Sequence, residues 1–220
     1  MNILFDLDGT LTDSFEGITK CISHAMTCLD RPAPQPEALR WCIGPPLKKS
    51  FARLLDSRDD ALAEQALALY RERFSSVGLF ENELYEDIPQ VLETLKSAGH
   101  DLYVATSKPW MYAKRIIQYF GLDKFFKGVH GSELDGTRTD KTSLIAHVLD
   151  MESLSANATV MVGDREHDMI GARANGVPGL GVLWGYGTRE ELEASGAYAC
   201  IERPSELNGI VNHSQIRAGC

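Results

Sequence analysis

Acidic residues stand at two places in the sequence where a short apolar run ends. Asp6 and Asp8 follow the first apolar run of the chain, and Asp164 and Asp168 follow a later one. Two like charges about 4 Å apart cost roughly 4 kcal/mol at an effective dielectric constant near 20, so four neighbouring carboxylates need a cation to stay ionised. Because these ligands offer only oxygen atoms and leave room for waters, the set predicts a Mg²⁺ site.

A hydroxyl group and an ammonium group join these carboxylates in the predicted site. Thr106, Ser107 and Lys108 follow the apolar run Leu102–Ala105, and Lys141 opens a helical pattern ahead of the second acidic motif. In open parallel sheets, ligands bind outside the carboxyl ends of the strands, so residues that directly follow strands meet in one crevice. We therefore expect all of these side chains to converge on one site.

Five short apolar runs predict the buried strands that would position this site. The runs are Ile3–Phe5, Leu102–Ala105, Gly128–His130, Thr159–Val162 and Gly179–Leu183. Helical patterns separate most of them, and Thr188 followed by Glu191 predicts a capping box at the start of a further helix. Such alternation is typical of a parallel sheet with helices on both faces. The predicted fold is therefore α/β, with a doubly wound, Rossmann-like parallel sheet.

One segment, from about Ser14 to Phe80, breaks this alternation. It has helical periodicity, as in the stripe that contains Ile18, Ile22 and Met26, and it shows no convincing strand. Prolines at residues 32–36 and 45–46 divide the segment, because proline breaks helices. We therefore predict a small helical domain inserted into the α/β domain.

Composition and charge restrict the partners of the chain. The 220 residues include 22 Lys and Arg and 31 Asp and Glu, so the net charge is −9. This balance argues against a nucleic-acid partner and against an anionic membrane surface. We also find no signal peptide, no apolar stretch near the roughly 20 residues of a membrane span, and no metal or disulfide spacing among the five cysteines. A cytoplasmic monomer or homodimer with reduced thiols is expected.

Four motifs, in this order along the chain, resemble those of the haloacid dehalogenase superfamily. They are DxDGT at Asp6–Thr10, a strand-end Thr/Ser at Thr106, a lysine at Lys141 and GDxxxD at Gly163–Asp168. The helical segment after Asp13 is similar to the cap that members of this type insert between the first motif and the second. The resemblance implies a catalytic core at residues 1–13 and 84–220 and a helical cap domain at residues 14–83.

The resemblance also implies a role for each acidic residue of the motifs. Asp6 would attack phosphorus to form an aspartyl-phosphate. Asp8 would protonate the leaving oxygen and later deprotonate the water that hydrolyses this intermediate. Asp6, the backbone carbonyl of Asp8 and Asp164 would bind Mg²⁺, while Asp168 would hold a metal-bound water or orient Lys141.

The remaining motif residues are implied to hold the phosphoryl group. Thr106, Ser107, Lys141 and the backbone N–H groups around Gly9 would contact its oxygens. A glycine at position 9 would let the loop backbone pass close to the phosphate. Lys108 neighbours the motif, and a role outside catalysis is favoured for it.

The second aspartate of the first motif narrows the predicted reaction. Dehalogenases and phosphonoacetaldehyde hydrolases resemble the chain but lack the equivalent of Asp8, because they have no ester oxygen to protonate. We therefore predict a Mg²⁺-dependent phosphatase that acts on a small phosphorylated metabolite. Phosphoglycolate is the favoured substrate, because Arg40, Lys48 and Lys49 would suit its carboxylate.

Three alternatives stay open at this point. Gly44-Pro45-Pro46-Leu47 looks like the branch that holds both phosphoglycolate phosphatases and 5′-nucleotidases, so a 5′-nucleotidase is one of them. A phosphoryl transferase similar to β-phosphoglucomutase is the second. The third comes from a different class: a phosphoaccepting receiver domain, against which both Asp8 and the helical insert argue.

Overall fold

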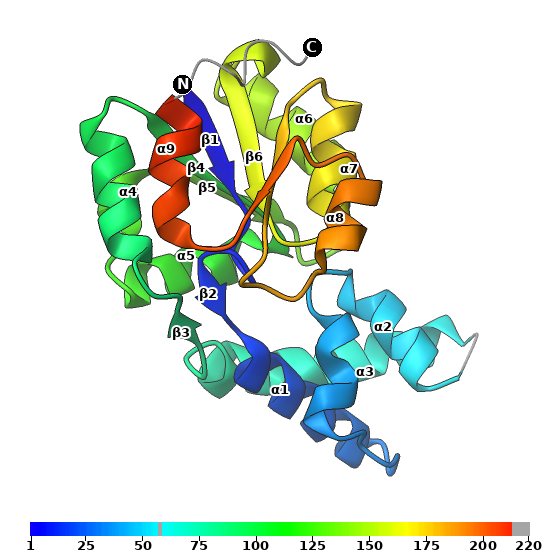
Figure 1. Ribbon diagram of the computed structural model, residues 1–220. Helices are drawn as coiled ribbons and strands as arrows, with labels where there is room; N and C mark the ends of the chain where they lie inside the picture. Colours follow the sequence, from blue (N-terminus) through cyan, green and yellow to red (C-terminus); the bar gives the residue numbers. More distant parts are fainter. Residues whose placement is uncertain (57–58, 213–220) are drawn as a thin grey trace. The chain divides into compact units, whose positions relative to one another are not determined.

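The computed structural model describes residues 1–56 and 59–212, which form two compact units (Figure 1). The first unit contains Met1–Thr12 and the chain from Leu84 onward, and the second contains Asp13–Glu83. Two short strands, β2 (Thr12–Asp13) and β3 (Glu83–Leu84), pair with each other where the chain passes from one unit to the other. The sequence pattern did not predict this pair, because two-residue strands are too short to show alternation.

The first unit is built on a six-stranded sheet. Its strands are β1 (Asn2–Phe5), β4 (Asp101–Pro109), β5 (Phe126–Ser132), β6 (Thr159–Gly163), β7 (Gly179–Val182) and β8 (Ala199–Ile201). Their order is β5-β4-β1-β6-β7-β8, and every neighbouring pair is parallel. This confirms the predicted parallel, doubly wound sheet. The chain moves outward in one direction through β4 and β5 and in the other through β6 and β7, so the topological switch point lies between β1 and β6.

Helices cover both faces of this sheet, as Figure 1 shows for α6, α7 and α8 on one side and α4, α5 and α9 on the other. The helices are α4 (Ile88–Ser97), α5 (Trp110–Tyr119), α6 (Lys141–Met151), α7 (Glu166–Ala174), α8 (Arg189–Ala194) and α9 (Leu207–Asn212). Short 3₁₀ turns η3 (Asp123–Phe125), η4 (Ala156–Ala158) and η5 (Pro204–Glu206) complete the unit. The doubly wound arrangement therefore leaves the carboxyl ends of the strands free to carry a site.

Two details of the sheet differ from the sequence-based expectation. No apolar run predicted β8, whose three residues extend the sheet beyond β7. Strand β4 continues past Ala105 to Pro109, because its pairing with β5 resumes at Ser132 after an irregularity in register between Thr106 and Pro109. Thr106 and Ser107 therefore lie within the last residues of β4 rather than in the loop that follows it.

The second unit is helical, as the sequence predicted for this segment. It contains α1 (Phe15–Cys28), the 3₁₀ helix η1 (Pro36–Cys42), α2 (Leu47–Leu54), α3 (Asp60–Arg73) and the π-helical turn η2 (Phe74–Gly78). The predicted stripe Ile18, Ile22 and Met26 is buried on one face of α1. Prolines divide the helices as expected, because η1 begins at Pro36 and α2 directly follows Pro46.

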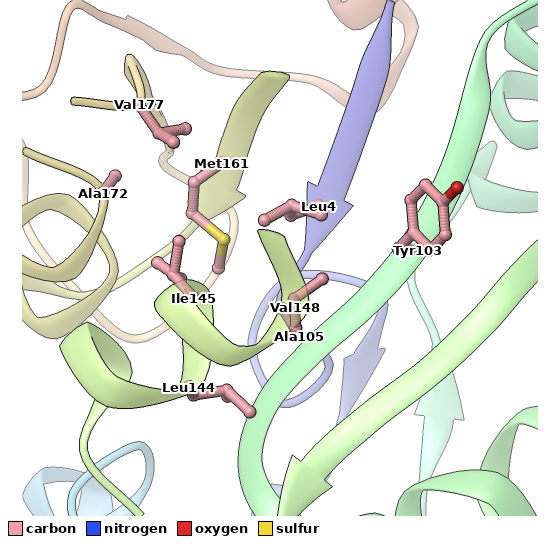
Figure 2. Close-up of a cluster of buried hydrophobic side chains, with 9 residues drawn as sticks. All are labelled: Leu4, Tyr103, Ala105, Leu144, Ile145, Val148, Met161, Ala172 and Val177. Carbon is pink, nitrogen blue, oxygen red and sulfur yellow. The ribbon is translucent and has the colours of Figure 1, made fainter. Parts of the chain in front are cut away.

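A cluster of buried apolar side chains fixes α6 against the sheet (Figure 2). Leu4 from β1 and Met161 from β6 belong to the same cluster as Leu144, Ile145 and Val148 from α6; the other members are Tyr103, Ala105, Ala172 and Val177. The helix residues of the cluster lie three, four and seven positions after the first residue of α6, and these spacings fall on one helical face. The packing that holds α6 therefore also turns its first residue, Lys141, toward the carboxyl ends of the strands.

Two further findings concern the described residues alone. No helix among them is long and apolar enough to cross a membrane. Their four cysteines are free thiols, and the fifth, Cys220, lies outside the described residues.

Candidate active site

Three carboxylates meet at the switch point of the sheet. Asp6 directly follows β1, and its backbone N–H donates to the carbonyl of Val162 in β6 at 2.9 Å. Because β1 and β6 are neighbours, their ends bring Asp6 beside Asp164 and Asp168. Each of the three offers an oxygen within 4.8 Å of the others. All three side chains are buried, whereas the fourth carboxylate of the predicted set, Asp8, is outside this group and pairs with Lys108.

Lys141 lies in the middle of these carboxylates. Its Nζ is 2.9 Å from Oδ1 of Asp6 and 2.5 Å from Oδ1 of Asp168, and it donates to the carbonyl of Ala105 at 2.8 Å. The start of α6 is fixed by Asp140, whose carboxylate accepts from the backbone N–H groups of the next turn, so the ammonium group is held in place. Asp168 thus contacts Lys141, and its choice between orienting this lysine and holding a metal-bound water stays a prediction.

The charges of this cluster do not balance. Burial raises the pKa of Asp164 well above its ordinary value, and the neighbouring Asp168 and Asp6 charges add to this rise. Burial, with Asp6, also raises the pKa of Asp168 to about 6 although Lys141 acts in the opposite direction. For Lys141, burial lowers the pKa, but the two carboxylates more than reverse this effect. Three buried carboxylates around one ammonium group therefore fit a further cation, and an all-oxygen donor set suits a hard ion such as Mg²⁺.

Close backbone contacts around Asp164 require glycine at positions 9 and 185. The backbone of Gly9 has φ +88°, and a Cβ there would lie 2.2 Å from Oδ2 of Asp164. A Cβ on Gly185 would lie 2.3 Å from the carbonyl oxygen of Gly9, and the N–H of Tyr186 donates to Oδ2 of Asp164 at 2.8 Å. Within this structure the reason for a glycine at position 9 is therefore the Asp164 carboxylate, whereas the sequence suggested only the approach of a phosphate. No motif in the sequence indicated Gly185 or Tyr186.

The carboxylate of Asp8 has a partner that the sequence did not predict. Oδ2 of Asp8 lies 2.9 Å from Nζ of Lys108, and both side chains are almost fully buried. Lys108 lies two residues after the strand-end Thr106, and this position indicated only that Lys108 is near the site. An ion pair between two side chains 100 residues apart depends on the pairing of β1 with β4, which the sequence does not state.

Thr106 and Ser107 lie at the end of β4, the other neighbour of β1. The Oγ1 of Thr106 accepts from the backbone N–H of Lys108 at 3.3 Å, which leaves its own O–H free to donate to a ligand. The carbonyl of Ser107 accepts from the hydroxyl of Ser132 in β5 at 2.9 Å. Thr106 is buried and Ser107 is half-buried, so the structure places both on the same strand end as predicted and leaves their phosphate-binding role a prediction.

The second acidic motif is held in place by a residue of α8. The side chain of Glu191 accepts from Nε of Arg165 at 2.8 Å and from the backbone N–H of Glu166 at 2.9 Å. The predicted capping box at Thr188 is therefore only half formed. Thr188 does accept from the N–H of Glu191, but the Glu191 carboxylate caps α7 instead of its own helix.

Replacing Gly9 by alanine should lower activity far more than the strain of a positive φ angle alone would explain. We expect kcat/KM to fall by about 10²-fold, because the new Cβ must push the Asp164 carboxylate aside. Gly99→Ala is the matched control, since Gly99 has φ +81° and a Cβ there would meet nothing within 4 Å. That variant should lose about 1–2 kcal/mol of stability and keep its activity. Steady-state kinetics and thermal denaturation of both variants check this, and equal losses of activity would contradict it.

The sequence matches the haloacid dehalogenase-like hydrolase family over residues 3–182, which include all of the site residues described above. The chain therefore belongs to this family. It is 50% identical over 193 residues to a 5′-nucleotidase of Pseudomonas aeruginosa, a match that covers 88% of this chain and 87% of the relative. It is 25% identical over 212 residues to a phosphoglycolate phosphatase of Colwellia psychrerythraea, covering 93% and 94%.

A solved structure shares the whole fold. The crystal structure of a predicted phosphatase from Clostridium acetobutylicum is 39% identical in sequence to the chain and superposes with a TM-score of 0.92. The match covers 96% of this chain and 97% of the phosphatase. Together with the family and the named relatives, this makes the chain a phosphatase of the haloacid dehalogenase type. The alternative of a receiver domain is set aside, because the match runs through both the first and the last motif.

Proposed function

We propose that the chain hydrolyses phosphate monoesters of small metabolites through an aspartyl-phosphate on Asp6, with the help of Mg²⁺. The observation that carries this proposal is the position of Asp6, buried at a strand end with Asp164 and Asp168 on one side and the Lys141 ammonium 2.9 Å away. A carboxylate in that place can approach a phosphoryl group only where positive charge offsets the repulsion.

In the first half of the proposed reaction, a carboxylate oxygen of Asp6 forms a bond to phosphorus. The ester P–O bond breaks, its electron pair stays on the leaving oxygen, and a protonated Asp8 gives that oxygen a proton. In the second half, the Asp8 carboxylate takes a proton from a water molecule whose oxygen attacks phosphorus. Inorganic phosphate leaves and the Asp6 carboxylate is restored. Asp6 directly follows β1, Asp8 lies two residues further on, and both side chains are buried.

The residues around Asp6 hold the phosphoryl group and the metal in this proposal. Asp6 and Asp164, with the backbone carbonyl of Asp8, would bind Mg²⁺, which when bound neutralises charge on the phosphoryl oxygens. Lys141 holds Asp6 in place, and its positive charge would attract the phosphoryl oxygens, although its three N–H groups already face Asp6, Asp168 and Ala105. The free hydroxyl proton of Thr106, with the loop N–H groups near Gly9, supplies further donors.

We place nucleoside 5′-monophosphates ahead of phosphoglycolate as substrates, which reverses the order favoured by the sequence alone. The relative named as a 5′-nucleotidase supports this, because its 50% identity is twice that of the phosphoglycolate phosphatase. Two of the three basic residues that suggested phosphoglycolate already have partners within the second unit. Lys48 pairs with Asp60 at 2.9 Å and Glu64 at 2.6 Å, and Arg40 lies over the ring of Phe15.

A panel of phosphate esters tests this order. We expect kcat/KM for at least one nucleoside 5′-monophosphate to exceed that for phosphoglycolate by more than about tenfold, a ratio within reach of differential contacts to the leaving group. Released inorganic phosphate, measured at equal substrate concentrations, gives the ratio, with p-nitrophenyl phosphate as the reference ester. A higher kcat/KM for phosphoglycolate would restore the earlier order, and transfer to a sugar hydroxyl without phosphate release would indicate the transferase alternative.

A further inference from the structure

Lys108 is a cation beside a reacting carboxylate to which neither the motifs nor the proposed mechanism gives a task. Its ammonium group lies 2.9 Å from Oδ2 of Asp8. Its side chain is only 6% exposed and that of Asp8 is 11% exposed, so this is not a solvated surface pair. Burying a lysine beside a carboxylate costs desolvation of both groups, and such a pair contributes little to stability when compared with apolar side chains of similar size. A buried pair at a reacting carboxylate therefore calls for a functional explanation.

The two oxygens of the Asp8 carboxyl group have different surroundings. Oδ2 is occupied by Lys108. Oδ1 is buried and has no hydrogen-bond partner among residues 1–56 and 59–212. A carboxyl group that transfers a proton needs one oxygen that is free to carry the proton. It also needs a contact to its other oxygen that stops rotation about χ2. The pairing with Lys108 divides the two oxygens of Asp8 in this way.

The backbone of Lys108 is fixed by strand β5 and by its own strand end. Its N–H donates to Oγ1 of Thr106 at 3.3 Å, and the neighbouring carbonyl of Ser107 accepts from Ser132 at 2.9 Å. Gly131 allows the closest approach, since a Cβ there would lie 2.4 Å from the carbonyl oxygen of Lys108. These three contacts thus fix the backbone from which the Lys108 side chain extends toward Asp8.

We propose that Lys108 is a positioning residue that holds Oδ2 of Asp8, so that Oδ1 delivers the proton to the leaving oxygen. This inference rests on the proposed function, because it takes Asp8 as the general acid. It extends that function by a residue outside the four motifs. Lys108 itself neither gains nor loses a proton in either half of the reaction.

Dependence on the leaving group distinguishes this role from others. Departure of an alkoxide needs a proton, whereas departure of 2,4-dinitrophenolate does not, so only the first should depend on a well-placed Asp8. The parameter to compare is kcat/KM, because it reports the steps up to departure of the leaving group and leaves out hydrolysis of the phosphoenzyme. Ethyl phosphate and 2,4-dinitrophenyl phosphate therefore serve as the two substrates.

Lys108→Met, which keeps the apolar stem and removes the charge, should lower kcat/KM for ethyl phosphate by about 10²-fold, the lower end of general acid catalysis. The value for 2,4-dinitrophenyl phosphate should change by less than about fivefold. Lys108→Arg should recover part of the loss with ethyl phosphate, because it restores a donor to Oδ2. Lys127→Met is the matched control. Lys127 pairs at 2.8 Å with Asp101, which lies in the same unit at the exposed amino end of β4. This variant should leave kcat/KM unchanged for both substrates.

A double-mutant cycle with Asp8→Asn completes the test. If Lys108 acts through Asp8, adding Lys108→Met to Asp8→Asn should cost no further activity with ethyl phosphate. Three outcomes would overturn the proposal: equal losses of kcat/KM with the two substrates, a change in KM alone, or additive losses in the cycle. Each of them points to a contact with the phosphoryl group or to general misfolding. Should Lys108→Met fail to fold, the same comparison is made with Lys108→Arg and Lys108→Gln.

Failure of this inference can be told apart from failure of the proposed function. Rapid acid quench of the wild-type protein with a ³²P-labelled ester should trap a phosphoenzyme that hydroxylamine releases, as expected for an acyl phosphate. Absence of this species would overturn the proposed function whatever Lys108 does. Its presence, together with equal losses for both substrates in Lys108→Met, would overturn the role of Lys108 alone.

Discussion

Asp6→Asn should abolish turnover while leaving the fold intact. An amide cannot replace a carboxylate as the nucleophile, and loss of a covalent nucleophile lowers kcat by more than about 10⁴-fold in enzymes of comparable mechanism. The side chain keeps its shape, so the burial of residue 6 at the end of β1 is unchanged. The substitution removes one partner of Lys141 but leaves its contacts with Asp168 and Ala105. It also removes one charge that raises the pKa of both Asp164 and Asp168.

Three measurements check this expectation. Steady-state release of phosphate gives the loss of kcat, acid quench shows whether a phosphoenzyme forms, and thermal denaturation shows whether the fold survives. Asp101→Asn is the matched control, because Asp101 begins β4 at the opposite end of the sheet and pairs only with the exposed Lys127 among the ion pairs of the described residues. Full activity in Asp6→Asn, or equal losses in the two variants, would contradict the role of Asp6.

The sequence predicted the parts of the fold and site that depend on local pattern. Short apolar runs are sufficient to locate β1, β4, β5, β6 and β7, because buried parallel strands are continuously apolar. The positions of Asp6 and Asp164 directly after two such runs then place them at one edge of the sheet. Lys141 could be assigned to the site because it opens a helix whose apolar stripe packs on that sheet.

Features that depend on contacts across the sheet could not be predicted. The pair of Lys108 with Asp8 requires β4 to lie beside β1, and a single sequence does not show strand order. The carboxylate of Glu191 had an equally plausible local partner in the capping box of its own helix, and tertiary contacts with Arg165 and Glu166 prevailed over it. Gly185 belongs to no motif, and only the structure shows that a side chain there would strike Asp164.

One physical requirement accounts for the missed contacts of Gly185 and Tyr186. Asp164 is buried with Asp6 and Asp168, so its carboxylate must be oriented by neutral donors and by close backbone contacts rather than by another cation of the chain. The N–H of Tyr186 supplies the donor at 2.8 Å, and Gly9 and Gly185 supply the space. The only cation of the four motifs, Lys141, contacts Asp6 and Asp168 instead. The oxygen-lined position beside Asp164 is thus the place where the charge of the site is least compensated.

Removal of divalent metal should therefore abolish turnover, and Mg²⁺ should stabilise the fold in a pH-dependent way. Chelation with EDTA followed by gel filtration should leave no measurable phosphate release, and millimolar MgCl₂ should restore it. At pH 8, Mg²⁺ at about 100 times its dissociation constant should raise the free energy of unfolding by about 2.7 kcal/mol, which corresponds to roughly 5–10 °C in Tm for a chain of this length. The stabilisation arises because the ion binds the folded carboxylates and not the unfolded chain.

The sign of the pH dependence follows from the raised carboxyl pKa values. Without metal, the folded state binds a proton at Asp168 up to about pH 6, whereas the unfolded chain releases it near pH 4. This carboxyl therefore destabilises the metal-free fold by an amount that grows as pH rises between these values and is fully present above about pH 6. Asp164, whose pKa is also raised, acts in the same direction. Mg²⁺ competes with these protons, so its effect on Tm should be largest above about pH 7 and small near pH 5.

Thermal denaturation with and without MgCl₂ at several pH values measures this directly. Asp164→Asn should lose most of the Mg²⁺-dependent rise in Tm at pH 8, because it removes from the cluster the carboxylate that forms no ion pair with a lysine of the described residues. Asp101→Asn should keep the whole rise, since its carboxylate lies at the far end of β4. A rise in Tm that is equal at pH 5 and pH 8, or one that persists in Asp164→Asn, would show that Mg²⁺ binds elsewhere on this acidic chain.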